Sequence, residues 1–231
     1  DVIEAFSGPE IEKMLENLYT DDIVDFIEEL PSNLVTKLLR NASVDQRANI
    51  NLLLSYPEDS AGSMMTVDFV ELKRNNTVKQ AIARIKRQGK VAETIANSFI
   101  VDENRTLVGS IRLREILFAD EEEIIENLME TDVIAVTTHD DQEAVANTFK
   151  KYDYSVLPVV NNEFKLMGII TADDIIDVMV EETTEDMQKI AAINPMDGSY
   201  KETTTFLMAK SRITWLIILM VSATFTGFIL Q

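Results

Sequence analysis

The stretch GIITADDIIDVMVEETTEDM, residues 168–187, decides the fold that we expect for this chain. Its apolar start predicts a strand that ends near Ile170, and the acidic, periodic remainder predicts a helix that begins near Thr171. At 3.6 residues per turn, four acidic residues share one face of this helix: Asp174, Asp177, Glu181 and Glu185. Four apolar residues share the opposite face, which we expect to pack against the protein: Ile175, Ile176, Met179 and Met187.

This acidic face is the first candidate for a functional site. No Lys or Arg interrupts the sequence between Leu166 and Gln188, and like charges one turn apart cost a few tenths of a kcal/mol per pair. A bound cation would relieve that repulsion. Two other interpretations stay open. The face is simply solvated, or Asp174 caps its helix, because Thr171 and Asp174 have the spacing of a capping box.

The composition narrows the possible functions. The chain has 231 residues, a net charge of −19 and 46% hydrophobic residues, which is enough for two or three small domains. Its acidity argues against nucleic-acid partners, which require basic surfaces. Because there is no Cys, disulfides, thiolate metal sites and Cys nucleophiles are excluded. The single His, His139, is expected in a surface loop. A carboxylate site suits Mg²⁺ or Ca²⁺ better than Zn²⁺, and this inventory does not favour an enzyme.

Residues 1–56 are predicted to form an all-helical N-domain that lacks its beginning. Three hydroxyl residues precede apolar-periodic runs at nearly constant spacing and are predicted N-caps of a small helical superhelix: Thr20, Ser32 and Ser43. On the helix after Thr20, Asp21, Asp25 and Glu28 share one face. The helix dipole favours acids in a first turn, which explains Asp21 without a ligand, whereas Asp25 lies too far along the helix for that.

The chain then contains two copies of one pattern, up to residue 177. After the turn-rich boundary YPEDSAG, residues 56–62, each copy has the order strand, helix, strand, strand, helix. The copies are predicted to span residues 57–120 and 121–177. Met65 and Met129 lie at matching positions near the start of the two copies, and Gly109 and Gly168 lie in matching strands. Strands and helices that alternate in this way predict two small, related domains.

The end of the chain changes in character. Residues 178–210 are predicted to be a connecting helix with its linker, and residues 211–231 to begin a membrane domain. Residues 213–230 form an uncharged run, and the length of this run is at the lower limit for a membrane-spanning helix. A buried core helix is the alternative. Lys210 and Arg212 precede this run, so the positive-inside rule places the earlier residues in the cytoplasm. We therefore expect the chain to be part of a longer protein of the cell membrane.

Two short sequences in the second copy resemble those of CBS domains, LPVV at residues 157–160 and GIITADD at residues 168–174. The order of the parts is also informative: an acidic helical domain, the YPEDSAG-type boundary, a CBS pair, an acidic exit helix and a membrane span. This order resembles the MgtE family of magnesium transporters and channels. The resemblance implies an α+β fold with a helical superhelix, a tandem CBS pair of βαββα repeats, a long connecting helix and a first transmembrane helix.

The resemblance also implies a mechanism. Members of this family form homodimers through their CBS domains and are multi-pass proteins of the cell membrane, whose cytoplasmic part senses the Mg²⁺ that they transport. Bound Mg²⁺ bridges the N-domain, the CBS pair and the connecting helix and favours a closed pore. The positions of this chain that match the acidic sensor are Asp21, Asp25, Asp141, Glu143, Asp153, Asp174, Asp177, Glu182, Glu185 and Asp186.

Two other classes of function remain open. In nucleotide-binding CBS pairs, a Thr and an Asp at the positions of Thr171 and Asp174 hold an adenosine nucleotide such as ATP, which makes a nucleotide-sensing module the alternative. The first copy departs from that pattern, because Arg112 and Glu115 stand at the matching positions and Ala96 offers no aromatic ring for stacking. The third class is a dimerisation scaffold whose acidic residues are merely solvated.

Overall fold

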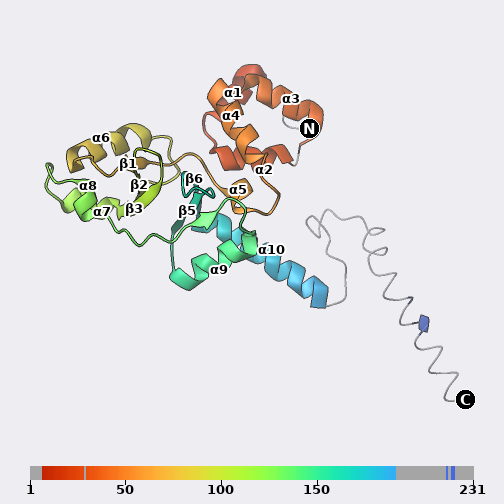
Figure 1. Ribbon diagram of the computed structural model, residues 1–231. Coiled ribbons are helices and arrows are strands. Elements are labelled where there is room, and N and C mark those ends of the chain that lie inside the picture. Colours follow the sequence, from red (N-terminus) through yellow and green to blue (C-terminus); the bar gives the residue numbers. More distant parts are fainter. Residues whose placement is uncertain (1–6, 29, 191–216, 218–219, 222–231) are drawn as a thin grey trace, which may run out of the picture. The chain divides into compact units, whose positions relative to one another are not determined.

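The computed structural model describes residues 7–28, 30–190, 217 and 220–221. It divides into two units, residues 1–175 and 176–231, and the boundary falls within one helix. The first unit contains four N-terminal helices and two three-stranded sheets with their own helices (Figure 1). This is the predicted α+β architecture, a helical domain followed by two related α/β repeats.

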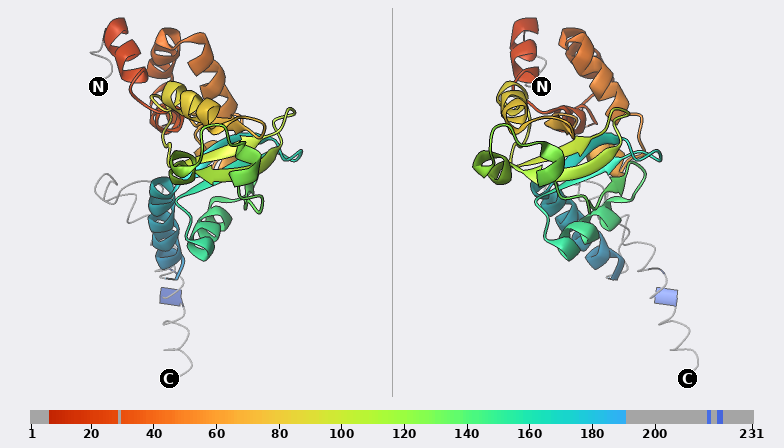
Figure 2. Two further views of the ribbon diagram at one scale, coloured as in Figure 1. Left: turned by 90° about the vertical axis from the view of Figure 1, so that its left-hand side faces the viewer. Right: turned by 60° about the vertical axis from the view of Figure 1, so that its left-hand side comes forward.

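The N-terminal helices pack around a small aliphatic core. Helix α1 contacts α3, and α2 contacts α4. Ile11, Ile23, Leu38 and Ile50 are fully buried between them. The four helices lie together in each view (Figures 1 and 2). Their bounds are Gly8–Leu15 for α1, Thr20–Glu28 for α2, Ser32–Asn41 for α3 and Val44–Leu53 for α4.

The predicted N-caps of this domain fare differently. Ser43 is the N-cap of α4, and its hydroxyl accepts a hydrogen bond from the Gln46 amide at 3.1 Å. The prediction for Ser32 is wrong: the N-cap of α3 is Pro31, and Ser32 is already the first helical residue. The carbonyl of Pro31 accepts from the amide of Leu34 at 2.8 Å, so the helix starts one residue earlier than the hydroxyl suggested.

A short connection fastens the helical domain to the second repeat. Residues Ala61–Met64 form helix α5, which the sequence did not predict. The amide of Ala61 donates to the carbonyl of Asp140 at 2.8 Å, and that of Gly62 donates to the carbonyl of Thr138 at 3.0 Å. The boundary segment is therefore built into the fold of the second repeat rather than being a free linker.

The two repeats have the predicted order of strands and helices. Each contains a three-stranded sheet in which the first pair of strands is parallel and the second is antiparallel. The first repeat consists of β1 (Glu71–Lys73), α6 (Val78–Gln88), β2 (Asn97–Val101), β3 (Leu107–Arg112) and α7 (Leu113–Phe118). The second consists of α8 (Ile125–Leu128), β4 (Val136–Thr137), α9 (Gln142–Tyr152), β5 (Val156–Val160), β6 (Leu166–Thr171) and α10 (Ala172–Ile190).

The segment that leads into each repeat pairs with the other repeat. Thr66 forms an isolated antiparallel bridge with Ile169 of β6, and Glu130 forms one with Ser110 of β3. A Cβ added at Gly168 would lie 2.6 Å from the carbonyl oxygen of Thr66. Only glycine allows this close approach of two backbones. The repeats are therefore interlocked and share one apolar core, which includes Phe99 of β2.

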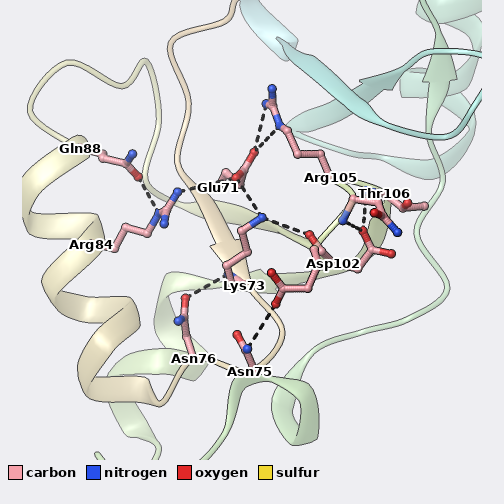
Figure 3. A network of polar contacts seen from close by, with 11 residues as sticks. Glu71, Lys73, Asn75, Asn76, Arg84, Gln88, Asp102, Arg105 and Thr106 are labelled. Atoms are coloured by element: carbon pink, nitrogen blue, oxygen red, sulfur yellow. Dashed lines mark hydrogen bonds and ion pairs between the residues drawn. The ribbon is translucent and has the colours of Figure 1, made fainter.

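A network of ion pairs stabilises the first repeat at its surface (Figure 3). The carboxylate of Glu71 in β1 accepts ion pairs from Arg105 at 3.1 Å and from Arg84 at 3.7 Å. Lys73 lies 3.7 Å from the same carboxylate and donates to the carbonyl of Asp102 at 3.1 Å. Glu71 thus links strand β1 to helix α6 and to the β2–β3 turn, which is a structural role.

Helix α10 differs from its prediction in the residues that it buries. Ile175 and Val178 are buried, whereas Ile176 is 61% exposed and Met179 is 39% exposed. Met187 is also exposed, so the predicted apolar stripe is confirmed only at Ile175 and is wrong at its other three positions. Among the described residues, no helix is both long and apolar enough to cross a membrane. The predicted membrane-spanning segment, residues 211–231, lies outside the described residues except for positions 217, 220 and 221.

Candidate metal centre

Three carboxylates from distant parts of the sequence meet in the first unit. Asp21, Glu93 and Asp174 each offer one carboxylate oxygen, and these oxygens all lie within 4.8 Å of one another. Asp21 is in the first turn of α2, Glu93 is in the loop between α6 and β2, and Asp174 is in the first turn of α10. The group therefore joins the helical domain, the first repeat and the end of the second.

Asp21 is the most buried member of this group. Its residue is only 8% exposed, and its Oδ1 atom has no hydrogen-bond partner among the described residues. Burial, together with the negative charges of Glu93 and Asp174, raises the pKa of Asp21 to about 7. A buried carboxylate oxygen without a partner is costly, so this oxygen fits a site that receives a cation or a proton.

Glu93 was not among the predicted site residues. Its Oε2 atom is also buried and without a partner in the described structure. Burial raises its pKa to about 7, although the nearby Thr171 hydroxyl opposes this rise. Glu93 lies in a loop, away from any acidic periodic pattern, so the sequence contained no signal that singles it out. Only the folded chain places it opposite Asp21.

Asp174 has two roles in this geometry. Its Oδ2 atom accepts hydrogen bonds from the Thr171 hydroxyl at 2.7 Å and from the Thr171 amide at 3.3 Å. This is one half of the capping box considered from the sequence. Burial raises the pKa of Asp174 despite these bonds. Because a carboxylate has two oxygens, capping α10 through one leaves the other for a ligand.

The other predicted residues of the first unit lie outside this group. Asp25 is exposed on α2. Asp141 caps α9 and accepts from the Glu143 amide at 2.9 Å, whereas Asp153 follows the same helix in a left-handed conformation. At 1.5 Å per residue, Asp141 and Asp153 are about 18 Å apart along α9. These two residues of one chain therefore cannot bind the same ion.

The remaining predicted ligands are on α10 in the second unit. Asp177 is exposed and Glu182 is half-buried. Glu185 and Asp186 lie on the same helix, but their side chains are outside the described part of the chain. All four follow Asp174 within a few turns, so this segment concentrates negative charge along one helix.

The first unit also contains a cleft of about 800 Å³ between the two repeats, next to the junction of β3 and α7. Its lining includes Arg112 and Arg114 from the β3–α7 junction and Tyr154 from the α9–β5 connection. The ring of Tyr154 stacks on that of Tyr152 with 5.9 Å between the ring centroids. Neither Thr171 nor Asp174 lines this cleft. Of the two predicted nucleotide residues, Asp174 belongs to the carboxylate group and Thr171 hydrogen-bonds to it.

The fold and the two junctions define a class of protein: a regulatory CBS pair preceded by a helical domain. Profiles of known families agree with this description. The MgtE intracellular N domain matches residues 1–59, and the CBS domain matches residues 61–122 and 125–181. The chain belongs to the MgtE family.

Relatives with solved structures are similar over most of the chain. A crystal structure of the soluble part of a magnesium transporter has 37% sequence identity, with a TM-score of 0.75, and the match covers 78% of this chain and 70% of that one. A crystal structure of the cytosolic domain of the Mg²⁺ channel MgtE in complex with ATP has 33% identity and a TM-score of 0.70, and it covers 77% of both chains.

The curated relatives are longer than this chain. The magnesium transporter MgtE of Thermus thermophilus is 38% identical over 80% of this chain and 41% of its own length. The magnesium transporter MgtE of Bacillus subtilis is 35% identical over 94% of this chain and 48% of its own length. The chain thus spans less than half of each.

Proposed function

We propose that this chain is the Mg²⁺-sensing regulatory region of a magnesium transporter of the cell membrane and that it lies on the cytoplasmic side. The observation that carries the proposal is the buried carboxylate of Asp21, whose Oδ1 has no partner in the described structure and which offers one oxygen within 4.8 Å of oxygens of Glu93 and Asp174. The names of the relatives support magnesium as the ion. In this proposal the region binds and responds to Mg²⁺ and catalyses no reaction.

The three carboxylates fit a hard divalent cation. All three donors in this group are carboxylate oxygens, and the single His of the chain is not among them. The chain has no Cys. Mg²⁺ prefers six oxygen ligands, keeps several waters and needs few carboxylates. The residues that would hold it are Asp21, Glu93 and Asp174, and the ion would supply the positive charge that three converging carboxylates lack.

Electrostatics explains how binding can report the Mg²⁺ concentration. Two carboxylates 4.8 Å apart repel each other by roughly 3.5 kcal/mol at an effective dielectric constant of about 20. Without a cation this repulsion opposes the docking of the helical domain on the repeats. Mg²⁺ stabilises the docked arrangement, because only there do all three carboxylates reach it. The docked arrangement is proposed to keep the pore closed.

The other predicted acids extend this sensor. Asp141, Glu143 and Asp153 on α9, Asp25 on α2, and the acidic face of α10 are proposed to bind further hydrated Mg²⁺ ions weakly. Weak, shared sites suit an ion that is abundant in cells. Several such ions acting together would make closure steep in Mg²⁺ concentration.

A homodimer through the CBS repeats is part of the proposal. Helix α7 ends in Leu117 and Phe118, which are 60% and 86% exposed. Large exposed apolar side chains that lie together mark an interaction surface. Sedimentation of the purified chain tests this: a dimer is expected, and Phe118→Asp should shift it toward the monomer.

Limited proteolysis of the purified chain in mild detergent tests the central proposal. Mg²⁺ is titrated from micromolar to tens of millimolar, and cleavage between the helical domain and the repeats is followed. Protection should rise with Mg²⁺ and should not rise with K⁺ at matched ionic strength. Cleavage that is indifferent to Mg²⁺ over the whole range would refute the sensing mechanism.

A second function, adenine-nucleotide binding, is favoured by the cleft. The cavity of about 800 Å³ is large enough for a nucleotide. Arg112 and Arg114 are the cleft residues that can pair with phosphates, and Tyr154 supplies an aromatic face that Ala96 does not. The same cleft is also lined by Glu130, which pairs with Arg112 at 3.2 Å, and by Asp132 and Asp153. The relative whose structure was solved in complex with ATP is consistent with this. Calorimetry with ATP in EDTA, and with Mg²⁺ alone, separates the two functions: heat from ATP without heat from Mg²⁺ would leave only the nucleotide sensor.

A further inference from the structure

We propose that Asp68, which precedes strand β1, is a positioning residue for the cation site. It would hold the three carboxylate-bearing segments in place by hydrogen bonds that need no cation. This inference rests on the Mg²⁺ site proposed above. It concerns a residue that is not itself a ligand and that lies outside every acidic pattern of the sequence.

The first contact of Asp68 is with the helix that carries Asp21. The Oδ2 atom of Asp68 accepts hydrogen bonds from the Thr20 hydroxyl at 2.7 Å and from the Thr20 amide at 2.9 Å. Thr20 is the first residue of α2 and directly precedes Asp21. A carboxylate at a helix N-terminus satisfies free amides and interacts favourably with the helix dipole. Asp68 therefore fixes the end of α2 from which the Asp21 side chain projects.

The second contact is with the loop that carries Glu93. The amide of Glu93 donates to the carbonyl of Asp68 at 2.8 Å. Asp68 thus contacts the helical domain through its side chain and the Glu93 loop through its backbone. Asp68 therefore links the segment that carries Asp21 to the segment that carries Glu93, and so helps to set the distance between these two carboxylates.

The third contact is made two residues earlier in the same segment. The amide of Thr66 donates to the carbonyl of Ile169 at 2.8 Å, and the amide of Ile169 donates back to Thr66 at 3.0 Å. Ile169 lies in β6, which leads directly to Thr171 and Asp174. The hydroxyl of Thr66 is buried, and its polarity opposes the rise in the pKa of both Asp21 and Glu93.

These contacts make residues 66–68 a hub for the whole site. The hub joins three segments whose carboxylates repel one another, and it does so without using the ligand oxygens that Asp21 and Glu93 leave unpartnered. If the hub is loosened, the binding-competent arrangement is less populated, and the apparent affinity for Mg²⁺ falls in proportion. Asp68 thus affects Mg²⁺ binding by positioning the ligands and not by an electrostatic interaction of its own charge with the ion.

Substitutions at Asp68 separate geometry from charge. Asp68→Ala removes the acceptor, whereas Asp68→Asn keeps a side-chain carbonyl that can accept both bonds from Thr20. The Mg²⁺ concentration at half-maximal protease protection should rise about fivefold to tenfold in Asp68→Ala, as expected for the loss of one to two hydrogen bonds. It should stay within about twofold of the unchanged chain in Asp68→Asn, since the bonds are retained. Asp45→Asn, an exposed acid on α4, is the control for loss of charge.

The partner residue provides a second, milder variant. Thr20→Val removes the hydroxyl donor but keeps the amide, so its shift should be smaller than that of Asp68→Ala. The double variant should shift the midpoint less than the two single shifts multiplied together, because both remove the same contact. The thermal midpoint in EDTA, measured beside the Mg²⁺ midpoint, reports whether any variant is simply unfolded. If Asp68→Ala is unfolded, Thr20→Val is used in its place to test the inference.

The outcomes distinguish this inference from the function on which it rests. If the unchanged chain responds to Mg²⁺ and Asp68→Ala responds equally well, the positioning role is wrong while the sensor stands. If Asp68→Asn is as impaired as Asp68→Ala, Asp68 acts through its charge and the inference is also wrong. If the unchanged chain ignores Mg²⁺, it is the sensing function itself that fails.

Discussion

The two repeats end in the same turn of backbone but carry opposite chemistry there. At the β6–α10 junction, the amide of Thr171 donates to Asp174 at 3.3 Å. At the β3–α7 junction, the amide of Arg112 donates to Glu115 at 3.2 Å. In both, an acid three residues into the helix accepts from the residue that precedes the helix. The duplicated fold therefore supplies the same local geometry twice.

What differs is the side chain at the first of these positions. Thr171 adds a neutral hydroxyl beside Asp174, and Asp21 and Glu93 complete a negative group around them. Arg112 instead adds a guanidinium, which pairs with Glu130 at 3.2 Å and lines the cleft. In our proposal one junction binds a cation and the other binds a nucleotide. The side chain at this position therefore differs between the repeats while the bond from the backbone amide to the acid is shared.

The largest expected effect tests whether the negative junction alone senses Mg²⁺. Asp174→Asn removes one charge from the site but keeps an oxygen that can cap α10. It should raise the Mg²⁺ midpoint of protease protection by about 30-fold or more, which corresponds to about 2 kcal/mol of lost interaction with the ion. The matched control is Glu115→Gln in the other repeat, which should leave the midpoint within about twofold. Equal shifts in both variants would mean that the sensor responds only to total charge.

The pH dependence of Mg²⁺ binding gives the next effect. The pKa values of Asp21 and Glu93 are raised to about 7, so below that pH each carries a proton that Mg²⁺ must displace. The Mg²⁺ midpoint should therefore rise by about tenfold per displaced proton for each pH unit below 7 and level off above about pH 8. Calorimetric titration across this range measures it, and a midpoint that is flat with pH would contradict the assigned ligands.

The same groups determine how stability depends on pH without Mg²⁺. A carboxyl whose pKa is higher in the folded chain than in the unfolded one stabilises the fold fully below its unfolded pKa. This contribution is lost as the pH rises from about 4 through about 7. In EDTA the chain should therefore melt at a lower temperature near pH 8 than near pH 5, and Asp21→Asn should reduce this difference.

The sequence predicted this comparison only in part. Periodicity and the CBS-like motifs identified the repeats, and the acidic face of the exit helix singled out Asp174, whereas Asp21 was added by the family resemblance. Glu93 and Asp68 were missed because each lies in a loop, where their roles depend on contacts with residues far away in the sequence. The face of α10 was misassigned because apolar residues occupy adjacent positions, and periodicity alone cannot tell that Val178 is buried while Ile176 is exposed. The contact between Met65 and Gly168, which joins the two repeats, also became visible only in the folded structure.

A smaller effect tests the positive junction. Arg112→Ala should weaken ATP binding by about fivefold, as expected for the loss of one charged contact to a phosphate. It should leave the Mg²⁺ midpoint unchanged, because Arg112 lies outside the carboxylate group. Thr171→Val is the reciprocal control, since Thr171 is at the matching position and does not line the cleft. Calorimetry with ATP in EDTA measures both. A loss of ATP binding in Thr171→Val instead would move the nucleotide to the other junction.

The smallest effect compares the two glycines at which the repeats interlock. An added Cβ at Gly168 meets the backbone oxygen of Thr66 at 2.6 Å, whereas at Gly109 it meets the flexible Met129 sulfur at 2.7 Å and a backbone oxygen only at 3.0 Å. A side chain can rotate away, but a paired backbone cannot. Gly168→Ala should therefore lower the free energy of unfolding by about 1 kcal/mol more than Gly109→Ala does. Urea unfolding in EDTA measures this difference. Because Thr66 belongs to the hub of the cation site, Gly168→Ala should also raise the Mg²⁺ midpoint, and a shift of equal size in Gly109→Ala would show that general destabilisation is the cause.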